Sequence, residues 1–140
     1  MIESRRIFID TSPYIYYLEK NSMYGNKVKE FLMRNYDSGS EFVTSAITIE
    51  EYSIVPYREE NTKLLNDFEL LLEDMETKVV DITKTIAKKA AQIRADYKNF
   101  KAMDALQLAA ALQSGCSIFL TNDKQLRQFK ELNVMTMEHL

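Results

Sequence analysis

The stretch RRIFIDTSP (residues 5–13) decides how this chain folds. Ile7, Phe8 and Ile9 form a near-continuous apolar run, which is typical of a strand in a sheet that is covered on both faces. Ser12 and Pro13 then have the residue types that begin a helix, because a serine caps free N–H groups and a proline fits the first turn. A buried strand that passes directly into a helix indicates an α/β fold.

The same alternation of strands and helices continues along the chain. Apolar runs predict further strands, and stretches with apolar residues at helical spacing lie between them. Because strands separated by helices cannot pair as hairpins, we expect a mostly parallel sheet of about five strands, covered by helices in a three-layer α/β/α arrangement. Strands are expected at residues 5–10, 41–46, 78–82, 117–121 and 133–137, with helices from residue 12 and at 26–35, 48–57 (interrupted near Pro56), 61–74, 83–97 and 104–114.

The composition is that of an ordinary globular protein. The 140 residues match the commonest domain size, and with only three Gly, two Pro and no repeat we expect one domain over residues 1–140. No apolar run approaches the ~20 residues that span a bilayer, and the first residues do not look like a signal peptide, so we expect a cytoplasmic protein without a membrane partner. Cys116 is the only cysteine, which excludes an intramolecular disulfide and a cysteine-based zinc site, and we expect it to pack in the core.

The charges are unevenly placed along the chain. The formal net charge is -3, but residues 59–76 carry seven acids against one base, Lys63, and residues 83–101 carry six bases against one acid, Asp96. The basic segment is either a solvated helix face or a surface on which a phosphate backbone docks. As RNA-binding candidates we take its six bases: Lys84, Lys88, Lys89, Arg94, Lys98 and Lys101.

Four acidic residues lie at the boundaries of the expected elements. Asp10 ends the first strand, Glu51 lies one turn after the second, Asp123 follows the fourth, and Asp104 opens the helix that leads to the fourth. In open parallel sheets, functional groups gather at the carboxyl ends of the strands. The sequence therefore predicts that four carboxylates meet in one cleft.

Each acid also has a purely structural explanation. Asp10 and Asp123 could cap the helices that follow them. Asp104 with Gln107 fits a capping box, and so does Thr48 with Glu51. Taken singly, capping acids are far commoner than catalytic ones. The joint pattern of all four favours a functional site.

Helical spacing separates Glu51 from its neighbour Glu50. Glu51 shares a stripe with Ile47, Ile54 and Val55, so we expect its carboxylate at the interior edge and that of Glu50 facing away. A carboxylate beside an apolar stripe with no cationic partner in sequence is costly unless a cation binds. Mg²⁺ or Mn²⁺, which prefer oxygen ligands, are the candidates.

Four segments carry a resemblance to a known family: FIDTS (residues 8–12), TSAITIEE (44–51), MDALQLAAA (103–111) and FLTNDK (119–124). In this order and at these boundaries they resemble the PIN-domain ribonucleases, and especially the VapC-like toxins of type II toxin–antitoxin systems. The resemblance spans nearly the whole chain. It implies a PIN domain in which Asp10, Glu51, Asp104 and Asp123 form an acidic quartet that binds the metal and is catalytic. Ser12, Thr121 and Asn122 would be polar neighbours of the site.

The resemblance also implies an activity and partners. The expected activity is hydrolysis of RNA phosphodiester bonds by a metal-activated water, and the expected partners are a small antitoxin protein and a second copy of the chain. The chain departs from the family where many members have Thr-Pro before the third acid and His or Ile after it, since Ala102-Met103 and Gln107 stand there. Asn122 stands where some members place a polar ligand, which leaves Asp123 the least secure of the quartet.

Two other functions fit parts of the pattern. A haloacid-dehalogenase-like phosphatase also uses an aspartate after the first strand with Mg²⁺, but it needs a second one two residues later, where Ser12 stands. A binding module that keeps the fold without catalysis is the other alternative, and the retention of four acids argues against it. A histidine-driven ribonuclease is excluded, because the only histidine, His139, is the penultimate residue. Three tyrosines, Tyr14, Tyr16 and Tyr17, either stack on bases or pack against a neighbouring helix or subunit, and we favour packing.

Overall fold

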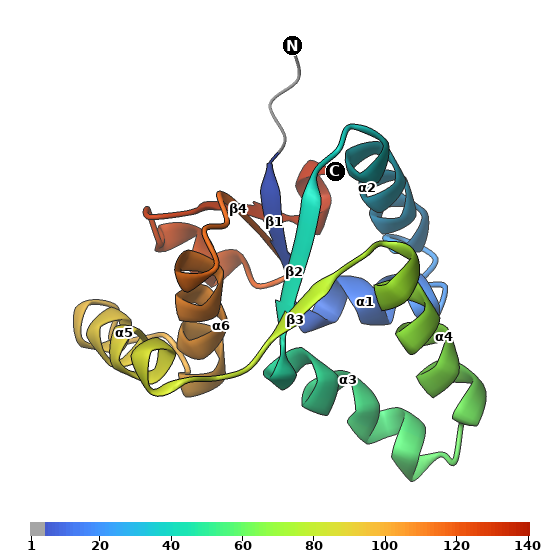
Figure 1. Ribbon diagram of the computed structural model, residues 1–140, viewed down its shortest axis with the longest axis horizontal. Coiled ribbons are helices and arrows are strands. Elements are labelled where there is room, and N and C mark those ends of the chain that lie inside the picture. Colours follow the sequence, from blue (N-terminus) through green and yellow to red (C-terminus); the bar gives the residue numbers. More distant parts are fainter. Residues whose placement is uncertain (1–4) are drawn as a thin grey trace.

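The computed structural model describes residues 5–140, and the first four residues of the expected domain lie outside the described part (Figure 1). Within residues 5–140, five strands alternate with six α-helices and two short 3-10 helices. None of these helices is both long and apolar enough to cross a membrane. The elements are β1 (Arg6–Ile9), α1 (Thr11–Leu18), α2 (Gly25–Asp37), β2 (Glu41–Ser45), α3 (Ala46–Arg58), α4 (Thr62–Asp74), β3 (Lys78–Val80), α5 (Lys84–Asp96), α6 (Ala102–Gln113), β4 (Ile118–Thr121), η1 (Lys124–Gln128), β5 (Asn133–Thr136) and η2 (Met137–His139).

The five strands form one parallel sheet in the order β3-β2-β1-β4-β5. This confirms the predicted α/β fold with a parallel sheet of about five strands. The chain builds outward from β1 to β3 and then returns to the other side of β1 with β4 and β5. Parallel sheets form a crevice at the carboxyl ends of the two strands where the order reverses. Here those ends are Ile9 of β1 and Thr121 of β4.

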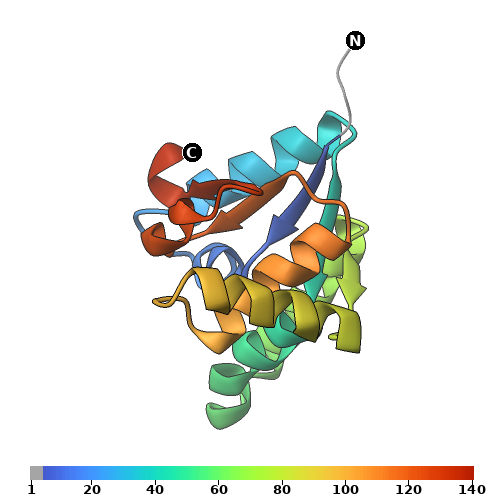
Figure 2. The same cartoon turned by 90° about the vertical axis from the view of Figure 1, so that its left-hand side faces the viewer.

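Helices cover both faces of the sheet, as predicted. In Figures 1 and 2, α5 and α6 lie together on one face, whereas Figure 1 shows α1, α2 and α4 on the other. Successive side chains of β1 point into the two cores in turn: Phe8 stacks on Phe119 beneath α6, and Ile7 and Ile9 pack beneath the opposite helices. Because both faces of β1 are buried, its apolar run had to be continuous.

The starts of three helices differ from the prediction. α1 is capped by Asp10 rather than Ser12, because the carboxylate of Asp10 accepts a hydrogen bond from the backbone N–H of Thr11, the first residue of the helix. α3 begins two residues early after the cap Ser45, whose hydroxyl accepts from the backbone N–H of Ile47, and α6 likewise begins two residues early, at Ala102. α3 also runs through Pro56 without the expected interruption.

The predictions for the cysteine and the first tyrosine are confirmed. Cys116 is buried in the core beneath α5 and α6, and burial raises the pKa of its thiol to about 12, so it stays protonated. Tyr14 is buried in the opposite core with its ring edge against Phe68, at 5.2 Å between ring centroids. Tyr16 packs against Tyr24. These rings pack in the fold, as we favoured.

Candidate active site

Asp10 lies at the bottom of the crevice between β1 and β4. Its Oδ1 atom accepts from the backbone N–H of Thr11 at 2.8 Å and from Nε2 of Gln107 at 3.2 Å. Its Oδ2 atom accepts from the hydroxyl of Thr121 at 2.8 Å. All three donors are neutral, and Asp10 is 9% exposed, so burial raises the pKa of its carboxyl group. The Asp10 carboxylate is thus held in place by neutral donors alone, with no positively charged side chain among its hydrogen-bond partners.

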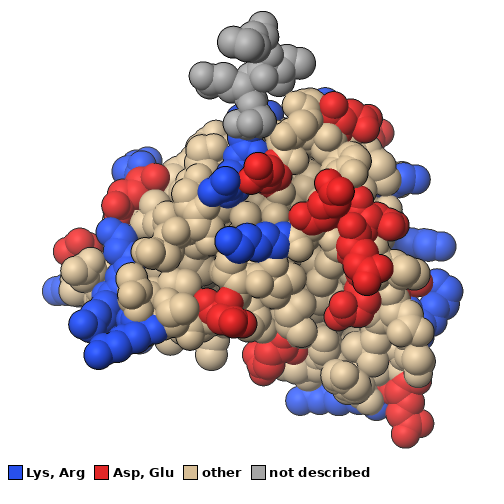
Figure 3. Space-filling view, viewed as in Figure 1, with Lys and Arg blue, Asp and Glu red and all other residues tan. Residues whose placement is uncertain are grey.

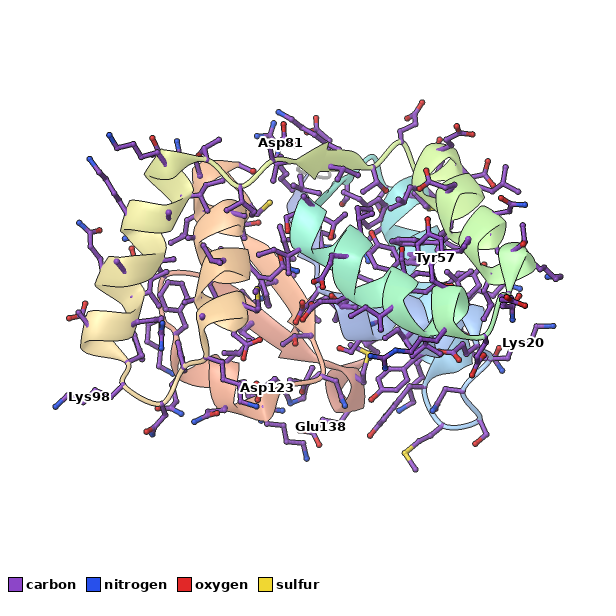
Figure 4. All side chains as sticks on the ribbon, turned by 90° about the horizontal axis from the view of Figure 1, so that it is seen from below. Lys20, Tyr57, Asp81, Lys98, Asp123 and Glu138 are labelled. Atoms are coloured by element: carbon purple, nitrogen blue, oxygen red, sulfur yellow. The ribbon has the colours of Figure 1, made fainter. Side chains whose placement is uncertain are left out.

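All four predicted acids line one open cavity of about 430 Å³ at this edge of the sheet. Figure 4 looks at this end of the molecule and labels Asp123 near its centre. The structure therefore brings together side chains that are up to 113 residues apart in sequence. The lining residues are Asp10, Thr11, Ser12, Ile15, Glu51, Asp104, Thr121, Asn122 and Asp123.

Glu51 reaches the cavity from α3, but not for the reason that the sequence indicated. Ile54 and Val55, expected to share its buried stripe, are 38% and 44% exposed. The buried side of α3 consists of Ile47 and Thr48 in its first turn, followed by Tyr52 and Pro56, and α3 packs mainly on α1 and α4. Glu51 stands beside that first turn, and its Oε1 atom accepts from the hydroxyl of Thr11 at 2.7 Å. Partial burial raises the pKa of the Glu51 carboxyl group.

Asp104 enters the cavity from the first turn of α6. Its pKa is raised to about 6, first by burial and then by the negative charges of Asp10, Asp123 and Glu51. Lys101 acts in the opposite direction and lowers this pKa, but it does not outweigh the other effects. The raised pKa means that the cavity resists holding all four acids in their charged form.

Asp123 combines two roles at the end of β4. Its Oδ1 atom caps η1 by accepting from the backbone N–H of Gln125 at 3.0 Å, as its structural explanation predicted, and the residue also lines the cavity. The loop that carries it is fixed to α1, because the backbone N–H of Asn122 donates to the Ser12 hydroxyl at 3.1 Å and its side chain donates to the Tyr16 hydroxyl at 2.7 Å. The two predicted capping boxes are wrong: the caps of α3 and α6 lie three residues before Thr48 and Asp104.

The chemistry of the cavity fits a hard divalent cation. Of its nine lining residues, four are acidic, none is basic, and every side-chain donor atom is an oxygen except for the amide nitrogen of Asn122. Among residues 5–140, no group of three or more Asp, Glu, His or Cys side chains is already arranged to hold a metal ion. Four mutually repelling carboxylates have no reason to draw closer until a cation balances them.

The six bases of the predicted RNA-binding segment do not form one uniform surface. Figure 3 shows basic side chains gathered on the side of α5, opposite the acidic ones on the side of α4. Lys84, Lys88, Arg94 and Lys98 are exposed, whereas Lys89 is partly buried and forms an ion pair with Glu131 at 3.3 Å. Lys101, the residue before α6, is exposed and close enough to the cavity to lower the pKa of Asp104. Of the six, Lys101, the last of the segment, is thus the base that acts on an acid of the cavity.

Sequence reasoning missed a set of buried polar side chains behind the cavity. Gln107, only 1% exposed, donates from Nε2 to Asp10 and, at 2.7 Å, to the hydroxyl of Thr48, and its Oε1 atom accepts from the hydroxyl of Ser45. The sequence indicated for Gln107 only a possible capping box with Asp104. Its position one turn after Asp104 on α6 was the signal that it faces the same site.

A parallel sheet with acids gathered at its topological switch point defines a class of α/β proteins that bind ligands at this edge. Within that class, the family model of the PIN domain matches residues 7–132. The chain therefore belongs to the PIN domain family, as its four motifs predicted. No curated protein sequence matches it significantly.

Solved structures share this fold at low sequence identity. FitAcB from Neisseria gonorrhoeae matches with a TM-score of 0.73 and 22% identity over 96% of this chain and 99% of that chain. A toxin–antitoxin complex from Klebsiella pneumoniae matches with a TM-score of 0.69 and 20% identity, covering 94% and 97%. The sarcin-ricin loop cleaving toxin VapC20 from Mycobacterium tuberculosis matches with a TM-score of 0.70 and 18% identity, covering 91% and 98%. These likenesses extend over nearly the full length of each chain.

Proposed function

We propose that the protein is a metal-dependent endoribonuclease and the toxin of a toxin–antitoxin pair. The observation that carries this proposal is the convergence of four carboxylates on one open cavity without a basic residue in its lining. Membership of the PIN family supports nuclease activity. We propose RNA as the substrate because the fold is similar to that of a toxin that cleaves the sarcin-ricin loop. Such a substrate would place the protein in the cytoplasm.

The metal would be Mg²⁺, with Mn²⁺ as a substitute, held by Asp10, Glu51, Asp104 and Asp123. When bound there, the metal ion would act as a Lewis acid that activates water and neutralises charge on the phosphate. The chain itself orients the ligands. The Asp10 carboxylate is fixed by three hydrogen bonds, Glu51 by the Thr11 hydroxyl, and Asp123 by its cap on η1.

The RNA backbone would be bound by the basic segment beside the cavity. Lys101 adjoins the site, and Lys98 extends the positive charge outward along the end of α5 (Figure 4). Phosphate contacts of this kind position a strand without reading its bases. The bases farther along α5 would add affinity for a longer strand.

The proposal of protein partners rests on the structural relatives, which include a toxin–antitoxin complex. We propose an antitoxin that covers the cavity and a second copy of the chain. Apolar side chains are exposed on α3 and α4, where Ile54, Val55, Tyr57 and Leu70 are each 38% to 70% exposed. Sedimentation of the purified chain gives its mass in solution, and a monomer at all concentrations would contradict the dimer.

The nuclease proposal is tested with a fluorogenic RNA in the presence of EDTA and after addition of Mg²⁺. Asp10→Asn and Asp104→Asn should each lower metal-dependent cleavage about a thousandfold or more, because they remove anionic ligands whose contribution is several kcal/mol. Asp74→Asn on the exposed side of α4 makes the same chemical change away from the cavity and should remain active.

The outcomes separate the three candidate functions. Equal cleavage by all variants would identify a contaminating nuclease, and no cleavage by the unaltered chain would favour a binding module. Hydrolysis of a phosphate monoester in place of RNA would favour a phosphatase. Cleavage of DNA with RNA left intact would contradict the proposed substrate. A fully active Asp104→Asn variant would rule out the quartet.

A further inference from the structure

Beneath the cavity, Gln107 of α6 links the helix that bears Asp104 to the end of β1, where Asp10 lies, and to α3, which bears Glu51. It lies on α6 and contacts Asp10 at the end of β1, Ser45 at the end of β2 and Thr48 in the first turn of α3. It is 1% exposed, so water cannot replace these bonds. A polar side chain is placed in such surroundings only if its hydrogen bonds are made.

The bonds of this amide group leave it no freedom. Both hydrogens of Nε2 are used, one by the Asp10 carboxylate and one by the Thr48 hydroxyl, while Oε1 accepts from Ser45. A flipped amide would turn its oxygen toward a carboxylate that can only accept, so the orientation is determined. The hydroxyl of Thr48 is in turn hydrogen-bonded to that of Thr44 at 2.8 Å, and Thr44 donates to the carbonyl oxygen of Ile9 at 2.7 Å. The network thus returns to the residue before Asp10.

The spacing along the two helices gives the network a consequence for the cavity. Thr48 lies three residues before Glu51 on α3, and Gln107 lies three residues after Asp104 on α6, so each acid is on the same helix face as its buried partner. The hydrogen bond of 2.7 Å between Gln107 and Thr48 therefore fixes the separation of the two helix turns that carry Glu51 and Asp104. The same amide holds the carboxylate of Asp10 between them.

We propose that Gln107 is a positioning residue: it orients Asp10 and sets the distance between the helix turns that bear Glu51 and Asp104. This inference rests on the proposed function. Gln107 does not line the cavity, so it is not placed to touch a substrate bound there. Its effect on metal binding is indirect, through the geometry of the acids. Partners that orient metal ligands in this way commonly change metal affinity or activity 10- to 100-fold when they are removed.

The test measures Mn²⁺ binding by the free-ion signal in electron paramagnetic resonance, without RNA, beside kcat and KM for a fluorogenic RNA. Gln107→Met keeps the length of the side chain and removes its hydrogen bonds. The expected result is a dissociation constant for Mn²⁺ raised about 10- to 100-fold and a lowered kcat, with KM for RNA unchanged because α5 is untouched. Gln113→Met is the matched control, since Gln113 lies on the same helix and is exposed.

Two further variants separate positioning from folding. Gln107→His keeps one N–H donor for Asp10 and should recover part of the Mn²⁺ affinity. Thr48→Val removes the bond between α3 and α6 and the bond to Thr44, but leaves that from Gln107 to Asp10. It should weaken Mn²⁺ binding in the same direction, and it decides the question alone if Gln107→Met does not fold. A purely structural role would lower the melting temperature and leave the Mn²⁺ affinity of the folded protein intact.

The outcomes distinguish this inference from the function on which it rests. If the unaltered chain does not bind Mn²⁺, the proposed function fails and the inference with it. If the unaltered chain binds Mn²⁺ and cleaves RNA, but the folded Gln107 and Thr48 variants bind Mn²⁺ within about twofold of it, only the inference is overturned.

Discussion

The carboxylates of the cavity differ in how firmly they are held. Asp10 is buried and accepts three hydrogen bonds, whereas Asp104 is half-buried and surrounded by three acids and one base. Burial and like charge both favour the protonated form of a carboxyl group. The folded protein without metal is therefore less stable with Asp104 charged than with it neutral.

This cost depends on pH in a defined direction. The pKa of Asp104 is about 6 in the folded protein and near 3.8 in the unfolded chain. Between these values the folded state binds more protons than the unfolded state, so the contribution of Asp104 to stability falls as pH rises through about 6. The full cost is present above pH 6 and is absent below the unfolded pKa.

Asp104→Asn should consequently raise the free energy of unfolding at pH 8 in EDTA by about 1 kcal/mol, a figure that is kept small because water screens a half-exposed group. The gain should shrink at pH 5. Urea denaturation at the two pH values measures it, with the exposed Asp74→Asn as control. If Asp104 did not feel the charges of the other acids, asparagine would serve nearly as well and stability would not respond to pH in this way.

At the scale of elements, the sequence predicted the order of strands and helices but not how every helix end is used. The continuous apolar run of β1 and the glycine-ended helices carry local signals that tertiary packing preserved. Glu51 was placed correctly for a reason that is wrong, because spacing alone cannot tell which side of α3 is covered. The caps Asp10 and Ser45 are local contacts, made to the backbone one and two residues further on, and the sequence indicated the first as one interpretation of Asp10 but not the second. The bonds of Gln107 reach residues that lie 59 to 97 positions earlier in the chain, so its helical spacing from Asp104 could indicate the face on which it lies but not its partners.

The basic segment allows a test at this scale. Lys98 and Lys101 lie toward the cavity end of the segment, so Lys98→Gln with Lys101→Gln should weaken RNA binding in EDTA and reduce the slope of log K against log salt by about 0.7 for each lost phosphate contact. Lys101 makes no side-chain cap for α6, so its replacement removes no such bond. Fluorescence anisotropy over a range of KCl concentrations measures the slope.

The control for this experiment is Lys63→Gln. Lys63 is exposed and paired with Asp67 at 2.6 Å on the acidic side of the molecule. Its removal should leave the slope unchanged. If the double variant at residues 98 and 101 also keeps the slope of the unaltered chain, these lysines belong to a solvated helix face and take no part in RNA binding.

At the scale of the whole molecule, the cavity depends on the complete fold. Its acids come from the ends of β1 and β4 and from α3 and α6, and two separate cores on the faces of the sheet support them. An unfolded chain does not bring residues 10, 51, 104 and 123 together. A cation that binds all four therefore binds the folded state alone and stabilises every element at once.

Mg²⁺ should accordingly raise the melting temperature of the whole protein. At a concentration ten times the dissociation constant, binding to the folded state adds about 1.4 kcal/mol, which for a chain of this length corresponds to a rise of about 3 to 6 °C. Asp10→Asn should lose most of this rise, because it removes the most firmly held ligand, and KCl at the same ionic strength should not replace Mg²⁺. Differential scanning calorimetry with and without Mg²⁺ measures the effect. A melting temperature that is equally insensitive to Mg²⁺ and to KCl would mean that the four carboxylates do not form a metal site, whatever activity the protein has.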